Sequence, residues 1–332
     1  MRRLAVALFC VVVLAAGCGD DDPAGAYRLD TIVRGLDGPT QLALTDDAWF
    51  VAQLNGGESD GTGQILRLDP DDLGAEPVVV LDGLQKPTGV ALFAGELWVM
   101  EERRLTRGPL DGSARTVVVD EMAYNGRSQG TLTVDGNRLL FNTSGTTRRP
   151  PGPDGSPVEV SGALWAVDAS GSITSVAWGF KHAYAHVVDR AGTIWTTEMS
   201  DGSFDGAPAA DEVVGVRAGS NHGWPSCVGD NRPVAESGVA DPCAGVPRSQ
   251  ATFDPGATPT GIAVAPWDAE RFVVALWVEG RIVQLSRSTS DAPAEIELLT
   301  DELRRPQHLV RDGDRLLVTD HEAGTIVAIE AR

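Results

Sequence analysis

The hydrophobic and polar positions of this chain follow one pattern that recurs six times. In each copy a turn precedes a short strand with alternating apolar residues, a Gly or Asp turn follows, and a second strand carries Trp, Phe or Leu. The copies are GPTQLALTDDAWFVAQ from Gly38, KPTGVALFAGELWVME from Lys86, GRSQGTLTVDGNRLLFNT from Gly126, KHAYAHVVDRAGTIWTTE from Lys181, TPTGIAVAPWDAERFVVAL from Thr258 and RPQHLVRDGDRLLVTDH from Arg305. Spacings of roughly 40 to 80 residues predict a repeat array, because one such unit cannot bury its own faces and must stack on neighbours.

Further strands follow most copies. A third strand of the type Gly-x-Ile-x-x-Leu starts at Gly63, Gly162, Gly280 and Gly324. A fourth, more exposed strand starts at Glu76, Arg115, Ser172 and Glu295. Because four strands make one blade, the pattern predicts an all-β protein, a six-bladed β-propeller with four-stranded antiparallel blades.

The two ends of the pattern predict how the ring closes. The last copy ends at Arg332 with only three strands, whereas a segment of the fourth-strand type, YRLDTIVRGL from Tyr27, precedes the first copy. An open blade would leave an unpaired edge that a toroid has to cover. We therefore expect the N-terminal strand to complete the sixth blade.

Length and composition agree with one large domain. No polar linker interrupts the repeats in the 332 residues, and 38 glycines supply turns for many short strands. We expect a targeting segment at residues 1–17, a short tether at 18–26 and the propeller at 27–332. Two Gly/Pro-rich departures from the repeat, at about 144–160 and 199–256, are expected on one face of the ring, where function also tends to lie.

The N-terminus has the features of an export signal. Arg2 and Arg3 precede an apolar run from residue 4 to 14 that is too short to span a bilayer, and Ala15-Ala16-Gly17-Cys18 follows as a small-residue cleavage site. Sites that end in Gly-Cys resemble the bacterial lipoprotein box, in which the cysteine is lipidated. We expect Cys18 to carry the lipid and to anchor the protein at the extracytoplasmic face of a bacterial cell envelope. The alternative is ordinary secretion with Cys18 left free.

The remaining cysteines and the net charge limit which covalent links, metal sites and partners are expected. Outside the targeting segment and Cys18, only Cys227 and Cys243 remain, an even pair within one loop. We expect a disulfide between them. A metal site is the weaker alternative, because the loop between them offers no His and no third Cys. The net charge of −20 argues against nucleic acid as a partner.

The segment between Trp178 and Pro225 carries the densest set of candidate functional residues. It contains GFKHA from Gly179, WTTE from Trp195, Asp211-Glu212 and GSNHGWP from Gly219. In order and spacing these resemble segments of the soluble quinoprotein glucose dehydrogenase and sorbosone dehydrogenase family. The resemblance implies a six-bladed propeller of the bacterial envelope that oxidises sugars with pyrroloquinoline quinone (PQQ) and calcium.

A calcium ion that polarises a quinone carbonyl needs hard oxygen ligands. Oxygen atoms near the expected rim are available on Glu198, Ser200, Asp201 and Asp211. The alternative is that Asp201-Gly202 is a turn and that Trp224 fills a core corner. Both interpretations of the acidic segment stay open at this stage.

Several positions depart from the family pattern. The family's catalytic base is a His, and the corresponding residue here is Arg127, which remains protonated and cannot act as a base. The resemblance places cofactor contacts at Lys181, His182, Arg305 and Gln307, and the family's fifth-blade Lys falls at Trp277. The cationic charge expected around the quinone is therefore reduced.

Other histidines are candidates to replace the missing base. The starts of the inner strands face the channel of a propeller, so His182 and His308 are expected near the axis, where they could share a pocket with Arg127 and Arg305. A structural role, with the imidazole bonded to neighbouring backbone, is the alternative. His222 is expected to fill the corner before Trp224, and His321, past a strand end, is expected to be solvated.

Three functional hypotheses remain. The first is a PQQ- and calcium-dependent oxidoreductase that acts on a sugar or other small alcohol. The second is a non-catalytic propeller that binds a ligand or partner. The third is a metal-dependent lactonase or lyase, which would centre its metal on residues such as Glu198 and Asn142. The fold alone does not choose among them.

Overall fold

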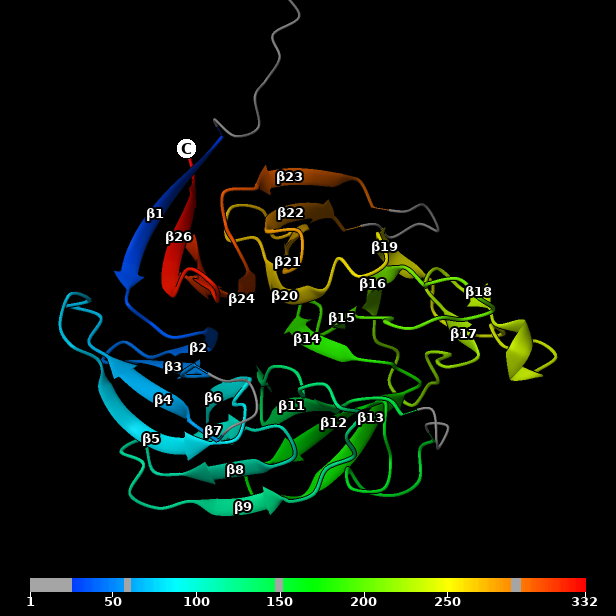
Figure 1. Cartoon of the computed structure of the whole chain (residues 1–332), viewed down its shortest axis with the longest axis horizontal. Coiled ribbons are helices and arrows are strands. Elements are labelled where there is room, and N and C mark those ends of the chain that lie inside the picture. Colours follow the sequence, from blue (N-terminus) through cyan, green and yellow to red (C-terminus); the bar gives the residue numbers. More distant parts are fainter. Residues whose placement is uncertain (1–25, 57–60, 147–151, 288–293) are drawn as a thin grey trace, which may run out of the picture.

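Six four-stranded antiparallel sheets surround a central axis (Figure 1). This is a computed structural model, and it describes residues 26–56, 61–146, 152–287 and 294–332. The six-bladed β-propeller predicted from the repeats is confirmed. The targeting segment and Cys18 lie outside the described residues. Within those residues the one helix is a 3-10 turn, η2 (Ala235–Ser237), and no helix has the length and hydropathy needed to cross a membrane.

Blades one to three follow the predicted order of strands. Blade one consists of β2 (Pro39–Leu44), β3 (Trp49–Gln53), β4 (Gly63–Leu68) and β5 (Val78–Leu84). Blade two consists of β6 (Gly89–Phe93), β7 (Glu96–Met100), β8 (Leu105–Gly108) and β9 (Thr116–Val119). Blade three consists of β10 (Thr133–Asp135), β11 (Arg138–Thr143), β12 (Ala163–Asp168) and β13 (Ile173–Trp178).

Blades four to six complete the ring. Blade four consists of β14 (Ala183–Val188), β15 (Ile194–Glu198), β16 (Asp211–Gly215) and β19 (Ser249–Phe253). Blade five consists of β20 (Pro259–Val264), β21 (Arg271–Leu276), β22 (Arg281–Ser286) and β23 (Ile296–Thr300). Blade six consists of β24 (Pro306–Asp312), β25 (Arg315–Asp320), β26 (Thr325–Ala331) and the N-terminal β1 (Tyr27–Arg34).

The two ends of the described chain pair to close the ring, as the sequence predicted. β1 runs antiparallel to β26, with partners from Tyr27 and Ala331 to Arg34 and Thr325. An ion pair of 2.7 Å between Arg28 and Glu330 lies along the same pair of strands. The edge of β26 is thereby covered by the opposite end of the chain.

Threonine hydroxyls connect several pairs of neighbouring blades. The hydroxyl of Thr40 donates to the carbonyl of Pro87 at 2.8 Å, and the hydroxyl of Thr260 donates to the carbonyl of Pro306 at 3.0 Å. Across the closure, the hydroxyl of Thr319 donates to the carbonyl of Thr40 at 2.6 Å. These bonds give the axis of the ring a defined geometry, since each one satisfies polar groups that are buried.

The hydrophobic core lies between blades rather than within one blade. Alternate side chains of each strand point to opposite faces of its sheet, so both faces of a blade pack on neighbours. Between blades four and five, the rings of Trp195 and Phe272 lie 5.0 Å apart in one buried cluster. The apolar alternation of the repeats therefore encodes the stacking of the blades.

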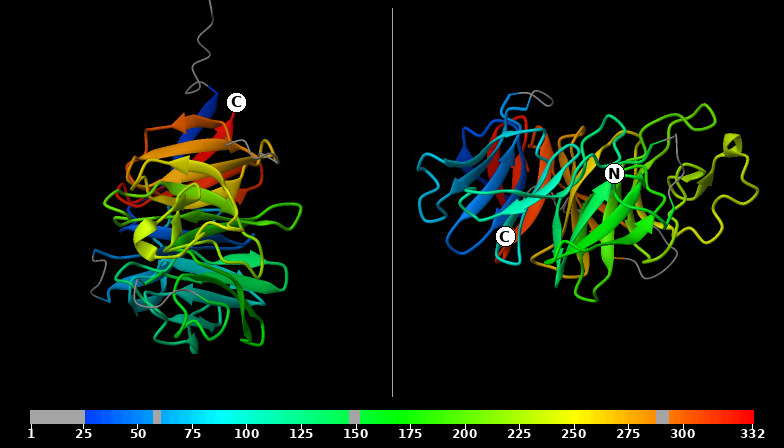
Figure 2. Two further views of the ribbon diagram at one scale, coloured as in Figure 1. Left: turned by 90° about the vertical axis from the view of Figure 1, so that its right-hand side faces the viewer. Right: turned by 90° about the horizontal axis from the view of Figure 1, so that it is seen from below.

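The second predicted insertion is partly regular structure. Residues 199–256 contain β16 and β19, the two outer strands of blade four, which the repeat pattern had not identified. Between them the chain forms the hairpin of β17 (Cys227–Val228) and β18 (Arg232–Pro233), followed by η2; this segment projects from the rim of the ring (Figure 2). The predicted disulfide between Cys227 and Cys243 is confirmed and ties this projection together.

Candidate functional site

A central cavity of about 320 Å³ opens on the axis at the end where the inner strands begin. All six blades contribute to its wall. Its lining includes Thr40, Lys86, Thr88, Arg127, Ser128, His182, Tyr184, Asp201, Asp211, Thr258, Thr260, Trp277, Gln307 and His321. A concave site in which side chains of every blade converge is the default candidate for ligand binding in a propeller.

His182 is a buried titratable group in the wall of this cavity. Its side chain is 4% exposed, and its Nε2 is buried without a hydrogen-bond partner. Burial lowers the pKa of His182 to about 3, although the negative charge of Asp201 opposes the shift. The imidazole is therefore neutral at physiological pH, and a buried polar atom that finds no partner in the protein is available to a ligand.

Glu198, at the end of β15, fixes the position of His182. Its carboxyl group accepts hydrogen bonds from the backbone N–H of Lys181 and from that of His182, the latter at 3.1 Å. Burial raises the pKa of Glu198 well above its usual range, and the nearby Glu212 adds to the shift. The carboxyl group of Asp320 has the same role in blade six, where it accepts the N–H of Arg304 and Arg305.

The contact between blades three and four is unusually close at this point. A Cβ on Gly130 would lie 1.9 Å from the carbonyl oxygen of Tyr184, so only glycine fits there. The N–H of Thr131 donates to the same carbonyl at 2.8 Å. This close approach brings Arg127 and Ser128 beside His182 in the cavity wall.

Arg127 is held by an acidic partner. Its guanidinium lies 3.0 Å from the carboxylate of Asp201, and the ammonium of Lys181 lies 3.6 Å from the same carboxylate. Lys181 also lies 5.6 Å from the ring of Trp224. Asp201 is thus shared by Arg127, which lines the cavity, and by Lys181, a predicted cofactor contact that is not among the lining residues.

The four oxygen ligands that the sequence predicted for calcium do not form one site. The carboxylate of Asp211 accepts the N–H of Ser200 and of Thr258, both at 2.8 Å, while Asp201 faces Arg127 and Lys181. Glu198 and Ser200 line a separate pocket. In the ranges that the structure describes, no three His, Cys, Asp or Glu residues are grouped to hold a metal ion.

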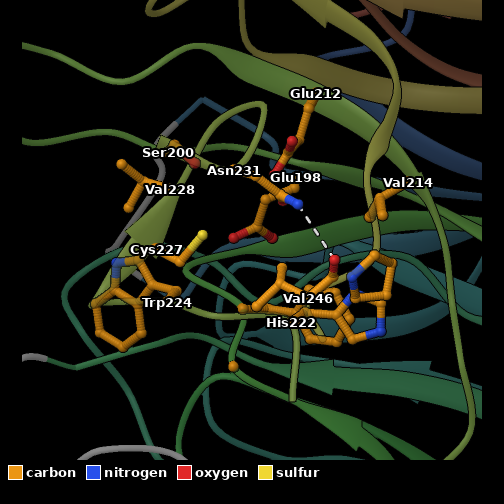
Figure 3. A pocket seen from close by; sticks show the side chains of 13 residues that line it. Glu198, Ser200, Glu212, Val214, His222, Trp224, Cys227, Val228, Asn231 and Val246 are labelled. Carbon is orange, nitrogen blue, oxygen red and sulfur yellow. Dashed lines mark hydrogen bonds between the residues drawn. The ribbon is translucent and has the colours of Figure 1, made fainter. Parts of the chain in front are cut away.

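That separate pocket lies behind the cavity wall in blade four and encloses about 10 Å³ (Figure 3). Glu198 and Glu212 line it together with Trp224, Cys227 and His222. The volume corresponds to roughly one water molecule. His222 stacks on Phe180 with ring centroids 4.4 Å apart, in agreement with its expected role in the corner before Trp224.

Of the residues of blades five and six that the resemblance placed at the cofactor, some line the cavity and others do not. Gln307 lines it and donates to the hydroxyl of Tyr184 at 2.5 Å. Arg305 instead packs over the ring of Trp277, 4.3 Å from its centroid, and pairs with Glu322 at 3.3 Å. Arg305 therefore supports Trp277, whose Nε1 is buried without a partner and which does line the cavity.

Two histidines lie elsewhere than the sequence predicted. His308 does not share the cavity of His182, because it lies deeper along its inner strand and lines a second cavity at the opposite end of the channel. His321, expected in solvent, is half-buried and lines the central cavity, with its ring centroid 6.2 Å from that of Trp277. Its Nδ1 lies 3.3 Å from the carbonyl oxygen of Pro39 at the start of blade one.

Several residues of the cavity wall were not predicted from the sequence. Thr40, Thr88 and Thr260 occupy the same place in three copies of the repeat, directly after a proline, and Gln307 has that place in the sixth. A comparison of equivalent positions among the copies would have identified them. Lys86 also lines the cavity and was not recognised.

Comparisons with known proteins agree with this architecture. The model of the glucose/sorbosone dehydrogenase family matches residues 127–328. None of the curated proteins matches the chain.

Three solved structures illustrate the similarity in fold. The calcium structure of a Trichoderma reesei enzyme of carbohydrate-active family AA12 is 17% identical, with a TM-score of 0.75 and coverage of 92% of this chain and 96% of that one. The PQQ-bound aldose sugar dehydrogenase of Streptomyces coelicolor is 16% identical, with a TM-score of 0.71 and coverage of 92% and 98%. The apo form of the soluble aldose sugar dehydrogenase of Escherichia coli is 18% identical, with a TM-score of 0.69 and coverage of 92% and 100%.

The family match extends over more than half of the sequence, from the third copy of the repeat through the sixth. It includes the segments that contain Arg127, His182 and Gln307, and the solved structures share the fold of the ring. The chain belongs to the glucose/sorbosone dehydrogenase family.

Proposed function

We propose that the protein is an oxidoreductase that acts on the CH–OH group of a sugar or a related small alcohol, with the central cavity as its active site. The observation that carries the proposal is the unpartnered Nε2 of His182, a buried neutral imidazole in the cavity wall. Family membership supports an oxidoreductase-like activity. The PQQ-bound form of the Streptomyces coelicolor aldose sugar dehydrogenase supports the choice of cofactor.

The donors of the cavity fit a quinone that carries carboxylates. The buried Nε1–H of Trp277 has no partner and can donate to a quinone or carboxylate oxygen. Lys86 and Arg127 supply positive charge, and Thr40, Thr88 and Thr260 supply hydroxyl groups. When bound, PQQ would supply the two-electron acceptor to which the alcohol carbon gives its hydride.

His182 is the residue that accepts the hydroxyl proton of the substrate in this proposal. As the C–H electron pair leaves with the hydride, the O–H proton passes to Nε2 and the alcohol becomes a carbonyl, so the substrate is oxidised by two electrons. Glu198 holds His182 in place through its backbone N–H. Arg127 cannot accept the proton, but its positive charge favours the negative charge that develops on the substrate oxygen.

No step of the proposal is assigned to calcium. Asp211 directs both carboxylate oxygens at backbone N–H groups, and Asp201 faces two cations, so the predicted oxygen ligands do not converge on one point. A calcium ion here would need ligands that these four residues do not jointly offer. The proposed chemistry of His182 does not depend on the ion.

The test of the function uses residues 19–332 with added PQQ and calcium. We expect quinone absorbance to remain with the protein after gel filtration, and dye reduction with at least one member of an aldose panel. His182→Gln should retain the quinone and lose turnover by at least 100-fold. His186→Gln, a substitution of another buried histidine that does not line this cavity, should retain turnover.

A second function, a propeller that binds a ligand without turning it over, has one observation in its favour. Arg127 is paired with Asp201, and the resemblance seen in the sequence implies that it occupies the position of the family's base. This alternative is favoured if quinone or sugar binds without dye reduction. Absence of quinone binding together with full retention of sugar binding would overturn the oxidoreductase proposal.

We also propose that the protein is held at the extracytoplasmic face of a bacterial envelope by a lipid on Cys18. The support is the sequence of the N-terminus, in which a short apolar run leads to Ala-Ala-Gly-Cys. Expression of the full chain with labelled palmitate should label the wild-type protein and leave Cys18→Ala unlabelled. Label on both, or on neither, would contradict the proposal.

A further inference from the structure

A second cavity, of about 450 Å³, lies at the opposite end of the channel from the proposed active site. The central cavity is lined by the starts of the inner strands, including Thr40, His182 and Gln307. The second is lined by the later residues of the same strands. Gln41 lines the second cavity, and its side chain donates to the carbonyl of Leu132 at 2.7 Å and accepts the N–H of Val90 at 3.1 Å.

One residue that lines the second cavity, His186, has a ring nitrogen without a hydrogen-bond partner. The side chain of His186 is 5% exposed, and its Nδ1 is buried and unpaired. Its other nitrogen, Nε2, lies 3.0 Å from the carbonyl oxygen of Ala183, and a carbonyl can only accept. Nε2 therefore carries the proton of the neutral ring, and Nδ1 offers a lone pair that needs a donor.

His308 lines the same cavity and adds a second polar group. Its Nδ1 accepts a long contact, 3.5 Å, from the N–H of Leu42, which leaves the proton of the neutral ring on Nε2. Burial lowers the pKa of His308 to about 3 and that of His186 to about 4, so both rings are neutral at pH 7. The inner part of the cavity thus combines a hydrogen-bond acceptor with a hydrogen-bond donor.

The walls of the cavity above the two histidines are aliphatic. The later residues of the inner strands that line it are mostly small or branched apolar residues, such as Ala91, Val134, Val188, Val264 and Val310. Such walls favour an apolar body over a second sugar, because a hydroxylated ring would lose its water without compensation.

Two arginines lie at the strand ends, toward the mouth. Arg190 and Arg311 line the cavity, and no carboxylate does so among the described residues. The described residues also offer no ion-pair partner to either guanidinium. The chain has a net charge of −20, but the lining of this cavity carries positive charge. The mouth of the cavity therefore favours an anion.

We propose that this second cavity is a binding site for a small apolar carboxylate that carries a hydroxyl group at its far end. The hydroxyl would donate to Nδ1 of His186, the apolar body would lie between the aliphatic walls, and the carboxylate would face Arg190 and Arg311. Arg190 lies four positions after His186, which at about 3.3 Å per residue of extended chain bounds the span at about 13 Å. A phenol with a propionate side chain has the right groups and fits within this span.

The test titrates residues 19–332 with 3-(4-hydroxyphenyl)propionate in a calorimeter. We expect saturable binding. The analogue without the phenol hydroxyl should bind at least fivefold more weakly, and the analogue with an uncharged amide in place of the carboxylate at least tenfold more weakly. The double variant Arg190→Gln, Arg311→Gln should reduce carboxylate binding at least tenfold and leave amide binding unchanged.

Two controls locate the site. Arg34→Gln with Arg67→Gln removes two exposed arginines elsewhere on the ring and should leave binding unchanged. Val134→Trp places a large side chain at a lining position that is 45% exposed, so the fold should tolerate it while the ligand is excluded. Absence of saturable binding, equal affinity for the three compounds, or undiminished binding to Val134→Trp would overturn the proposal. Because the readout is binding at the opposite end of the channel, these outcomes are independent of quinone binding or sugar turnover.

Discussion

Arg127 and Asp201 form an ion pair between blades three and four, with Nη2 and Oδ2 3.0 Å apart at the mouth of the central cavity. The pair is open to solvent, since the Arg127 side chain is 64% exposed and that of Asp201 is 40% exposed. The same carboxylate lies 3.6 Å from the ammonium of Lys181. Asp201 therefore sets how much positive charge the mouth presents to an anionic ligand.

Removing the charge of Asp201 should strengthen the binding of an anionic cofactor. In Asp201→Asn the cations of Arg127 and Lys181 lose their shared partner, and exposed charge pairs of this kind are worth up to about 1 kcal/mol. We expect PQQ to bind about three- to fivefold more tightly in an absorbance titration at low salt. The gain should disappear at high ionic strength, because salt screens exposed charges.

Asp312→Asn is the matched control for that experiment. Asp312 pairs with Arg315 at 2.8 Å, away from the central cavity, and the substitution removes the same charge from the molecule. PQQ affinity should not change. If both variants bind PQQ more tightly by the same factor, net charge rather than the Arg127–Asp201 pair is responsible.

The buried histidines should make the protein lose stability in mild acid. Burial lowers the pKa of His182 to about 3 and of His186 to about 4, whereas an unfolded histidine titrates near 6.5. Below pH 6.5 the unfolded chain binds protons that the folded chain does not, so the free energy of unfolding falls as pH falls. His186 alone should contribute a loss of about 2 kcal/mol between pH 7 and pH 5 by this linkage.

Urea unfolding of the wild type and of His186→Gln at pH 7 and pH 5 measures the contribution of His186 to the change in the free energy of unfolding. The variant should be less stable at pH 7 but should lose about 2 kcal/mol less than the wild type on going to pH 5. The buried carboxyl groups act in the opposite direction: the pKa of Glu198 is raised, so its burial costs stability as pH rises above 4.5. Equal pH dependence in the two proteins would contradict the assignment of a neutral buried ring to His186.

The repeats made most of the fold predictable. Copies such as KPTGVALFAGELWVME specify two strands, a turn and two apolar faces, and these local features agree with the ring that buries those faces. The outer strands of blade four escaped prediction because a long excursion separates β16 from β19, so their pairing depends on contacts distant in sequence. The disulfide within that excursion was predictable, since only two cysteines remained to form it.

The spacing of residues in the sequence did not predict which end of the channel each histidine lines. His182 and His308 both lie near the start of an inner strand, yet they line opposite ends of the channel. His182 precedes a register shift between Ala183 and His186, and His308 follows the equivalent shift that begins at Pro306. His308 therefore corresponds to Ala185, and His182 to Arg305. The register shifts in β14 and β24 determine which end of the channel each histidine lines. These shifts cannot be read from the spacing of residues in the sequence.

Trp277 should contribute directly to cofactor affinity. Its Nε1–H is buried without a partner and lines the central cavity, so a cofactor oxygen can satisfy it. A hydrogen bond of this kind contributes about 1 kcal/mol, and we expect Trp277→Phe to weaken PQQ binding about fivefold. Trp267→Phe is the control, because the Nε1–H of Trp267 already donates to Gln284 at 2.8 Å, outside the cavity. Equal losses in both variants would point to a general effect on stability.

Ring closure by β1 gives the most direct test of the architecture. A chain that begins at Gly35 lacks β1, so the backbone edge of β26 is exposed and Val33 no longer fills its place in the core between blades one and six. Exposed strand edges pair with other chains. We expect this chain to form oligomers in size-exclusion chromatography, whereas a chain that begins at Ala26 should remain monomeric. A synthetic peptide of residues 26–36 should restore the monomer by adding the missing strand. If the chain from Gly35 stays monomeric with an unchanged unfolding midpoint, β1 does not close the ring in solution.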